Sequence, residues 1–298
     1  FPSMSLAATT AAQVYVTNNG VEFSSDDGGV TVAVVGRTST FAVSPNHGST
    51  AGGTPVRIMT RRFPSSGTAY CRFDGSLTVP ATVADRLVRC VTPPHGPASV
   101  TLELSTDGAF WMTLDTPFEF APPPTVSGMD PAFGGVNGGT AIGVTGTGLG
   151  RVALCQVGGV AASIVAANET RMVCLSPRRL EAGHASVRVS TNGADFVRGG
   201  LAFVYVPTPR ITALWPPSGP ERGGTVLSLM GVHMMQAGGL ACRFGGSTAA
   251  AASIVAASWI SNNTVKCVTP AAMPGGTTVA LSLNGADFYE SEVDFTFH

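Results

Sequence analysis

Charge is scarce in this sequence. Asp, Glu, Lys and Arg together make up 12% of the 298 residues, the formal net charge is −1, and Lys266 is the only lysine. Binding to nucleic acid needs many uncompensated Lys and Arg side chains on one face. The composition therefore argues against a nucleic-acid partner.

Long hydrophobic runs are absent as well. The most apolar stretch, residues 249–257, is too short and too rich in alanine to span a bilayer. The sequence starts at Phe1, and no signal peptide is visible. We expect no membrane contact by this segment, and we expect any leader or anchor to lie outside it.

Helical periodicity is not sustained anywhere, and 37 glycines and 21 prolines would interrupt a long helix. Short stretches of alternating apolar residues instead predict strands. Examples are residues 99–105, 186–190 and 279–283. Each is followed by a turn that tolerates positive φ, namely Asp107-Gly108, Asn192-Gly193 or Asn284-Gly285. An aromatic residue then appears on the strand that returns from each turn, and we assign this position to Phe23, Phe110, Phe196 and Phe288. The pattern predicts an all-β fold of β-sandwiches.

The sequence repeats itself about every 85 residues. Gly-Gly-Thr begins at Gly52, Gly138 and Gly223, and two cysteines follow each time, the second of them separated from a proline by two residues. We predict three tandem domains, residues 39–121, 122–207 and 208–298. Residues 1–38 match the last two strands of a repeat, and we predict that they belong to a truncated preceding repeat.

The six cysteines fall two in each repeat, so equivalent domains favour one pairing. It is Cys71–Cys90, Cys155–Cys174 and Cys242–Cys267. Disulfides persist in oxidising compartments, so this pairing predicts an extracellular or cell-surface location. The alternative is three pairs of buried free thiols in a cytosolic protein. Zinc is disfavoured, because the spacing is not Cys-X-X-Cys and the five histidines share no repeat position.

The segments between the repeats are short and rich in proline. They are residues 120–126 and 206–211. Because proline fixes φ and favours extended backbone, we expect semi-rigid linkers and an elongated array with restricted bending.

Taken in order, these motifs resemble the IPT/TIG domain, an immunoglobulin-like sandwich of the early-set type. The third repeat carries the resemblance best, in residues 211–234, 242–246, 267–270, 284–288 and 295–297. The resemblance covers residues 40–298 and, in part, 1–38. The paired cysteines before Thr-Pro are similar to the extracellular branch of the family, which includes plexins, the hepatocyte growth factor receptor and fibrocystin-like proteins. The intracellular branch occurs in Rel-type transcription factors. The resemblance implies that these domains bind partners or act as spacers.

Candidate catalytic carboxylates are Glu103, Asp107 and Asp195. However, Asp195 and Asp287 occupy the same position of two repeats, whereas an active site needs different groups that converge once. We predict no enzyme activity, catalytic residue, metal or cofactor. Asp26-Asp27 is a weak candidate for calcium, and a polar hairpin tip is the preferred interpretation.

Several exposed features are candidates for contact. Arg61-Arg62 and Arg178-Arg179 would bind phosphate or sulfated sugar, although solvated loop charges are the simpler interpretation. Two sequons, at Asn168 and Asn262, lie in the same loop of two repeats and predict N-linked glycans. Trp259, in a longer loop of the third repeat, is either a partner contact or part of the core.

The leading hypothesis is an extracellular structural or adhesive protein, in which the repeats form a rod, surface filament or coat through protein–protein contacts that include self-association. The low charge and the repetition support this hypothesis. The first alternative is the stalk of a cell-surface receptor ectodomain. The second is a non-catalytic accessory region of a secreted carbohydrate-acting enzyme.

Overall fold

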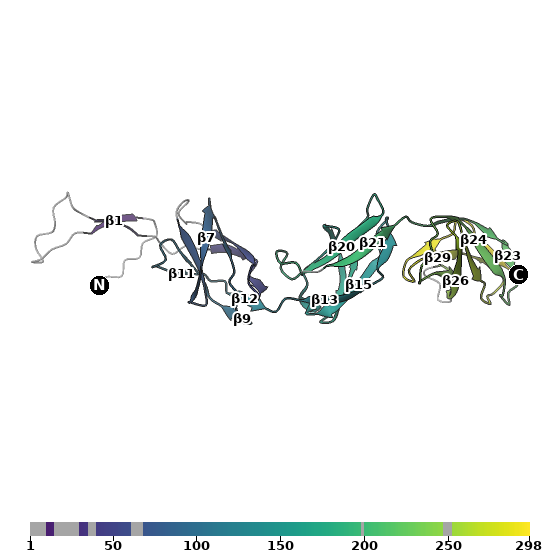
Figure 1. Ribbon diagram of the computed structural model, residues 1–298, viewed down its shortest axis with the longest axis horizontal. Helices are drawn as coiled ribbons and strands as arrows, with labels where there is room; N and C mark the ends of the chain where they lie inside the picture. Colours follow the sequence, from purple (N-terminus) through teal and green to yellow (C-terminus); the bar gives the residue numbers. More distant parts are fainter. Residues whose placement is uncertain (1–9, 15–29, 35–39, 61–67, 198–199, 247–251) are drawn as a thin grey trace, which may run out of the picture. The chain divides into compact units, whose positions relative to one another are not determined.

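The computed structural model describes residues 10–14, 30–34, 40–60, 68–197, 200–246 and 252–298. The chain divides into two compact units, Phe1–Pro122 and Pro123–His298. Apart from one three-residue 3-10 helix, Leu149–Arg151, the regular elements of the described residues are β-strands (Figure 1). The predicted all-β fold class is therefore confirmed.

The second repeat shows the sandwich most simply. One sheet contains, in spatial order, β13 (Thr125–Asp130), β15 (Ala141–Thr147), β19 (Arg171–Leu175) and β18 (Ile164–Ala167). The facing sheet contains β14 (Phe133–Gly135), β21 (Leu201–Val206), β20 (Gly183–Ser190), β16 (Leu154–Val157) and β17 (Val160–Ala162) (Figure 1). Neighbouring strands are antiparallel except β14 and β21, which are parallel. Buried side chains of both sheets, among them Ile142, Met172 and Phe203, form one core.

The third repeat has the same plan with one change. Its larger sheet has the order β22 (Arg210–Trp215), β24 (Val226–Val232), β27 (Thr264–Val268), β26 (Ser253–Ser261), β25 (Ala241–Phe244), β29 (Val279–Ser282) and β30 (Phe288–Glu290). Its smaller sheet has the order β23 (Ser218–Gly219), β31 (Phe295–Phe297) and β28 (Gly275–Thr277). The long strand β26 pairs with both β25 and β27, so it turns the corner between the two layers.

The first repeat is built like the third. Its larger sheet has the order β11 (Met112–Thr113), β10 (Leu102–Ser105), β6 (Ala69–Phe73), β7 (Leu77–Ala84), β8 (Leu87–Val91), β5 (Pro55–Thr60) and β3 (Thr40–Ser44). Its smaller sheet has the order β4 (His47–Ser49), β12 (Phe118–Ala121) and β9 (Ala98–Val100). Here β7 is the corner strand, because it pairs with β6 and with β8.

A disulfide joins two strands on either side of the sandwich corner in each repeat: β6 and β8, β16 and β19, and β25 and β27. The bonds are Cys71–Cys90, Cys155–Cys174 and Cys242–Cys267. The Cα atoms lie 6.4, 6.7 and 6.4 Å apart, within the span that a disulfide bridges. All six cysteines are buried in the cores of their repeats. Each bond therefore ties the two layers of one sandwich together from inside.

The Gly-Gly-Thr motif forms a loop that docks onto the segment after the second cysteine. In the second repeat the Gly139 N–H donates to the Ser176 carbonyl at 2.8 Å, and the Thr140 N–H donates to Ser176 Oγ at 3.1 Å. The first and third repeats make the same bond from the motif threonine to Thr92 or Thr269. The two most distinctive motifs of the sequence are thus the two halves of one contact.

A second contact explains the glycine that precedes this loop. A Cβ built on Gly134 would lie 2.0 Å from Thr140 Oγ1, and the equivalent distances for Gly48 and Gly219 are 2.2 and 2.3 Å. The motif threonine therefore packs directly on the backbone of the short parallel strand β14, β4 or β23. This packing keeps one end of each sandwich compact.

The N-terminal strands β1 (Thr10–Val14) and β2 (Val30–Val34) form an antiparallel pair in which Val14 faces Val30. By the sequence match these residues correspond to Val187 and Leu201, which face each other in β20 and β21. The hairpin therefore has the register of the last strands of a repeat. The assignment of residues 1–38 to a truncated repeat stays a prediction, and Phe23, Asp26-Asp27 and Arg61-Arg62 lie outside the described residues.

The sequence assignment of Phe110 is wrong. Leu104 faces Cys71 and Met112, and Leu281 likewise faces Cys242 and Tyr289, so Met112 corresponds to Tyr289. Trp111 therefore takes the place of Phe196 and Phe288, and Phe110 takes the place of an aspartate. An arginine stacks on each of the three equivalent rings: Arg72 on Trp111, Arg188 on Phe196 and Arg243 on Phe288. Phe110 itself is 82% exposed.

Candidate functional site

The turn after β29 is shaped by its own polar side chains. Ser282 Oγ accepts the Gly285 N–H at 2.8 Å, and Asn284 Oδ1 accepts the N–H groups of Ala286 and Asp287 at 3.0 and 2.8 Å. Such local bonds are the reason that Asn and Ser favour turns. They use the amide oxygen of Asn284 and leave its Nδ2 and the Asp287 carboxylate for other partners.

Two of these partners, Phe133 and Thr140, lie on the second repeat, within the same compact unit. Asn284 Nδ2 donates to the Phe133 carbonyl at 2.9 Å and to Asp287 Oδ2 at 3.0 Å. Thr140 Oγ1 donates to Asp287 Oδ2 at 2.7 Å. Hydrogen bonds to a charged group are stronger than neutral ones, about 1.5–3 kcal/mol each. The turn of the third repeat therefore binds the motif loop of the second.

Packing surrounds these bonds. The Phe133 ring is half-buried and packs against the core of the third repeat. The Tyr289 hydroxyl lies against the backbone of Gly135, where an added Cβ would come within 2.7 Å of it. Burial raises the pKa of Tyr289 above its usual value, and the Asp287 charge raises it further. Thr140 is only 1% exposed. We call this surface, Phe133–Gly135 with Thr140 on one side and Asn284–Tyr289 on the other, the repeat junction.

The carboxylates considered for catalysis have structural roles. Glu103 Oε2 accepts a bond of 2.6 Å from Arg72, and this bond holds the pKa of Glu103 below its usual value. Asp107 accepts the N–H groups of Phe110 and Ala109, which lower its pKa. Asp195 Oδ2 accepts a bond from Asn192 at 3.0 Å. Among the described residues no group of three His, Cys, Asp or Glu side chains is arranged to hold a metal ion.

Arg179 is tied down within its own repeat: it donates to the His184 carbonyl at 3.3 Å and lies over the Tyr205 ring. Arg178 beside it is exposed. The two side chains therefore lie in different surroundings, and their interpretation as solvated loop charges stays a prediction.

Trp259 belongs to the core. It is half-buried against the core cluster of the third repeat, and its Nε1 donates to the Met234 carbonyl at 3.2 Å. Ile254 and Ile260, which alternate with it along β26, are 61% and 51% exposed. The interpretation of Trp259 as a partner contact is not supported.

Both sequons lie at the same hairpin of the sandwich. Asn168 is in the turn between β18 and β19, and Asn262 is in the turn between β26 and β27. Both asparagines are exposed. Asn168 Oδ1 accepts the N–H groups of Thr170 and Arg171, which fixes the side chain at the surface.

A sequence profile matches this architecture: the IPT/TIG domain profile fits residues 39–120, 124–205 and 209–297. The chain belongs to the IPT/TIG domain family. The family assignment and the observed sandwiches agree with the resemblance found in the sequence motifs.

Relatives within the IPT/TIG family include long proteins. Plexin A3 of Danio rerio is 30% identical over 195 residues, which are 58% of this chain and 10% of the plexin. Fibrocystin-L of Homo sapiens is 32% identical over 112 residues, which are 36% of this chain and 3% of the relative. The structure of the full extracellular region of plexin A4 aligns over 88% of this chain and 24% of its own length, with 17% identity and a TM-score of 0.46. The chain thus spans a tenth or less of the length of these two curated relatives.

The IPT/TIG repeats of this chain are of the disulfide-bearing kind. All six cysteines are in disulfides, so the alternative of buried free thiols does not hold. Disulfides of this kind are rare in the cytosol. Together with the similarity to plexin A3 and fibrocystin-L, they give the chain an extracellular or cell-surface character. No helix among the described residues has the length and apolar content of a membrane span.

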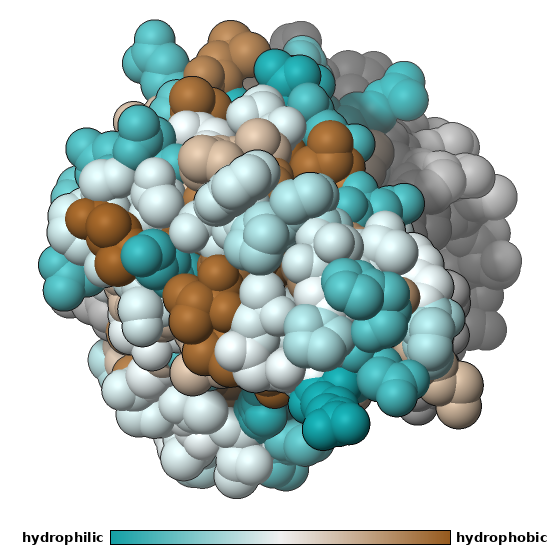
Figure 2. Space-filling model, turned by 90° about the vertical axis from the view of Figure 1, so that its right-hand side faces the viewer, coloured by the Kyte–Doolittle hydropathy of each residue, from teal (hydrophilic) through white to brown (hydrophobic). Residues whose placement is uncertain are grey.

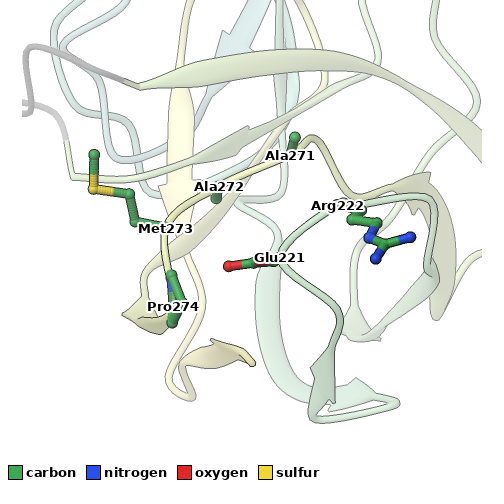
Figure 3. A pocket seen from close by; sticks show the side chains of 6 residues that line it. All are labelled: Glu221, Arg222, Ala271, Ala272, Met273 and Pro274. Carbon is green, nitrogen blue, oxygen red and sulfur yellow. The ribbon is translucent and has the colours of Figure 1, made fainter.

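A pocket lies at the far end of the third IPT/TIG repeat, which is the end opposite the repeat junction (Figure 3). It is lined by Glu221, Arg222, Ala271, Ala272, Met273 and Pro274. The Glu221 carboxylate points toward Ala272 and Met273, whereas the Arg222 guanidinium points away from them (Figure 3). Met273 is 89% exposed, so the pocket is open at this edge. A single inward carboxylate beside exposed apolar groups does not make the convergent polar set of a small-molecule site.

Replacing Thr140 with valine should loosen the repeat junction. Valine keeps the shape of threonine but cannot donate to Asp287, and the loss of one charged hydrogen bond corresponds to about a tenfold change in equilibrium. We expect about tenfold faster hydrogen exchange in residues 133–140 and 284–289, measured by mass spectrometry on the full chain.

Thr225→Val is the matched control, because Thr225 has the same position in the third repeat and makes the same backbone bond to its own Thr-Pro segment. It should leave exchange at the repeat junction unchanged. Equal loosening by both variants would mean that the hydroxyl of Thr140 does not hold the junction.

Proposed function

We propose that this chain is a spacer segment of an extracellular or cell-surface protein, comparable to the stalk of a receptor ectodomain, and that it acts through protein–protein contacts. The observation that supports this proposal best is the repeat junction. Its polar bonds and the half-buried Tyr289 hold two IPT/TIG repeats against each other, and a flexible string of domains would lack such contacts. The similarity to plexin A3 favours the stalk over the surface filament.

A self-associating filament or coat stays the second candidate. Val226 and Val268 face each other on neighbouring strands, and they are 55% and 51% exposed. An exposed apolar pair on a sheet face is a feature that a homotypic contact would use.

Sedimentation of the secreted chain separates the two candidates. A spacer should remain monomeric across the micromolar range, whereas a filament subunit should assemble as its concentration rises. Concentration-dependent assembly that Val268→Ser abolishes would overturn the spacer and establish the homotypic face.

We further propose N-linked glycans on Asn168 and Asn262. In a chain secreted from eukaryotic cells, peptide-N-glycosidase should lower the apparent mass, and Asn168→Gln and Asn262→Gln should each remove one part of that shift. Asn263→Gln is the control, because it keeps the sequon of Asn262 intact. An unchanged mass in both sequon variants would refute glycosylation at this hairpin.

A further inference from the structure

The far end of the third repeat is built like the surface of the second repeat that the junction covers. Thr225 packs on Gly219 as Thr140 packs on Gly134. Its N–H donates to Thr269 Oγ1 at 3.1 Å, which is the distance of the equivalent bond in the second repeat. Ser218, in the parallel strand β23, has the position of Phe133 in β14.

The two surfaces differ in what covers them. Thr140 is 1% exposed beneath the turn of the third repeat, whereas Thr225 is half-buried. On the face of the molecule drawn in Figure 2, hydrophobic side chains lie in separate groups among hydrophilic and neutral ones. This end is therefore not a bare hydrophobic patch.

We propose that Ser218–Pro220 and Thr225 form a docking surface for a further IPT/TIG domain, and that this domain brings a turn of sequence Asn-Gly-X-Asp. The asparagine amide donates to the Ser218 carbonyl, and Thr225 Oγ1 donates to the aspartate. The bonds are those of the repeat junction, with Ser218 in place of Phe133 and Thr225 in place of Thr140. The inference goes beyond the proposed function, since it holds for a stalk and for a filament.

One residue difference between the two surfaces restricts which domain can dock on the third repeat. Pro220 stands where the second repeat has Gly135, and a Cβ at Gly135 would lie only 2.7 Å from the Tyr289 hydroxyl. Pro220 has this Cβ. The residue that follows Asp-Phe in the partner must therefore be smaller than tyrosine.

The second repeat itself carries a turn that meets this requirement. Residues 192–197 read Asn-Gly-Ala-Asp-Phe-Val. Asn192 Oδ1 accepts the N–H groups of Ala194 and Asp195 at 2.9 and 2.8 Å, and Asn192 Nδ2 donates to Asp195 at 3.0 Å. These bonds match those of the turn at Asn284. A domain of the second-repeat type, with Val197 in place of Tyr289, is the predicted partner.

The test adds such a domain to the full chain. A second copy of residues 122–206 is fused after His298, so that Pro122–Pro124 takes the place that Pro207–Pro209 has between the second and third repeats. We expect hydrogen exchange in residues 216–225 to slow about tenfold relative to the unfused chain, as one charged hydrogen bond implies. The fusion should sediment as a monomer.

Two variants of the fusion make the test specific. Thr225→Val, or Asp195→Ala in the added copy alone, should return the exchange of residues 216–225 to the unfused rate, while the melting temperature of the third repeat stays unchanged. An added copy of residues 207–298 should protect this segment less, and Tyr289→Val in that copy should restore protection. No protection in the parent fusion, protection that survives both variants, or protection only in a dimer would overturn the proposal.

Discussion

Replacing Cys155 and Cys174 together with alanine is expected to lower the free energy of unfolding of the second repeat by about 3 kcal/mol. The bond joins residues 19 apart in sequence, and the loop that it closes limits the freedom of the unfolded chain. A domain of this size has a modest core, so the loss is a large part of its stability. Denaturant-dependent hydrogen exchange of the β15 and β19 amides measures the change within this one repeat.

Reductant provides the control for this prediction. With the disulfides reduced, the parent chain and the double variant should have similar stability, because both then lack the crosslink. A difference that persists in reductant would assign the effect to packing of the buried sulfur atoms. An intact parent chain that takes up alkylating reagent before reduction would contradict the disulfides and remove the main argument for an extracellular location.

The repeats were predictable from sequence because their constraints are local. The loop at Gly138-Gly139 needs glycine whatever surrounds it, and the Ser176-Pro177 segment that it meets begins two residues after Cys174. Both features recur in all three repeats, so each copy supports the other two. The sandwich fold follows from such short-range signals and from alternating strands.

The prediction of the aromatic residue in the first repeat was wrong for a different reason. Phe110 follows an Asp-Gly-Ala turn, where the other repeats have one more residue before their aromatic, and the sequence alone does not say which residue occupies which place. Only the cross-strand register, with Leu104 opposite Met112, assigns the arginine-stacked position to Trp111. Trp259 was ambiguous in a similar way. An alternating strand has two faces, and sequence does not tell which one the core takes.

The repeat junction could not be found from local patterns, since Thr140 and Asp287 lie 147 residues apart. One signal was present, however. Aspartate recurs at positions 195 and 287, and the turn itself does not need it, because Asn284 and Ser282 already satisfy the turn N–H groups. At Asp287 the carboxylate is not needed by the turn N–H groups, and it accepts the bond from Thr140 of the preceding repeat. The first repeat has Phe110 at this position, so its turn has no counterpart of the Asp287 carboxylate.

Replacing Gly138 with alanine should destabilise the second repeat by about 3 kcal/mol or more, whereas Gly139→Ala should cost about 1–2 kcal/mol. Both glycines have left-handed backbone, with φ of 75° and 85°, so both substitutions are strained. Only at Gly138 would the new Cβ also meet backbone, 2.7 Å from the Arg178 nitrogen and 2.8 Å from the Ser176 oxygen. At Gly139 nothing in the described structure lies within 4 Å of it.

Comparing Gly138→Ala with Gly139→Ala separates backbone strain from close packing. Both variants have the strain of a left-handed backbone, but only Gly138→Ala also has a close contact. The same hydrogen-exchange measurement on β15 and β19 reports both. If the two variants lose equal stability, the loop can move away from the Ser176 segment, and the close contact between the two motifs is not what fixes this end of the sandwich. If Gly138→Ala loses more, as expected, and also speeds exchange at Asn284–Asp287, then the motif loop supports its own domain and the neighbour that rests on it.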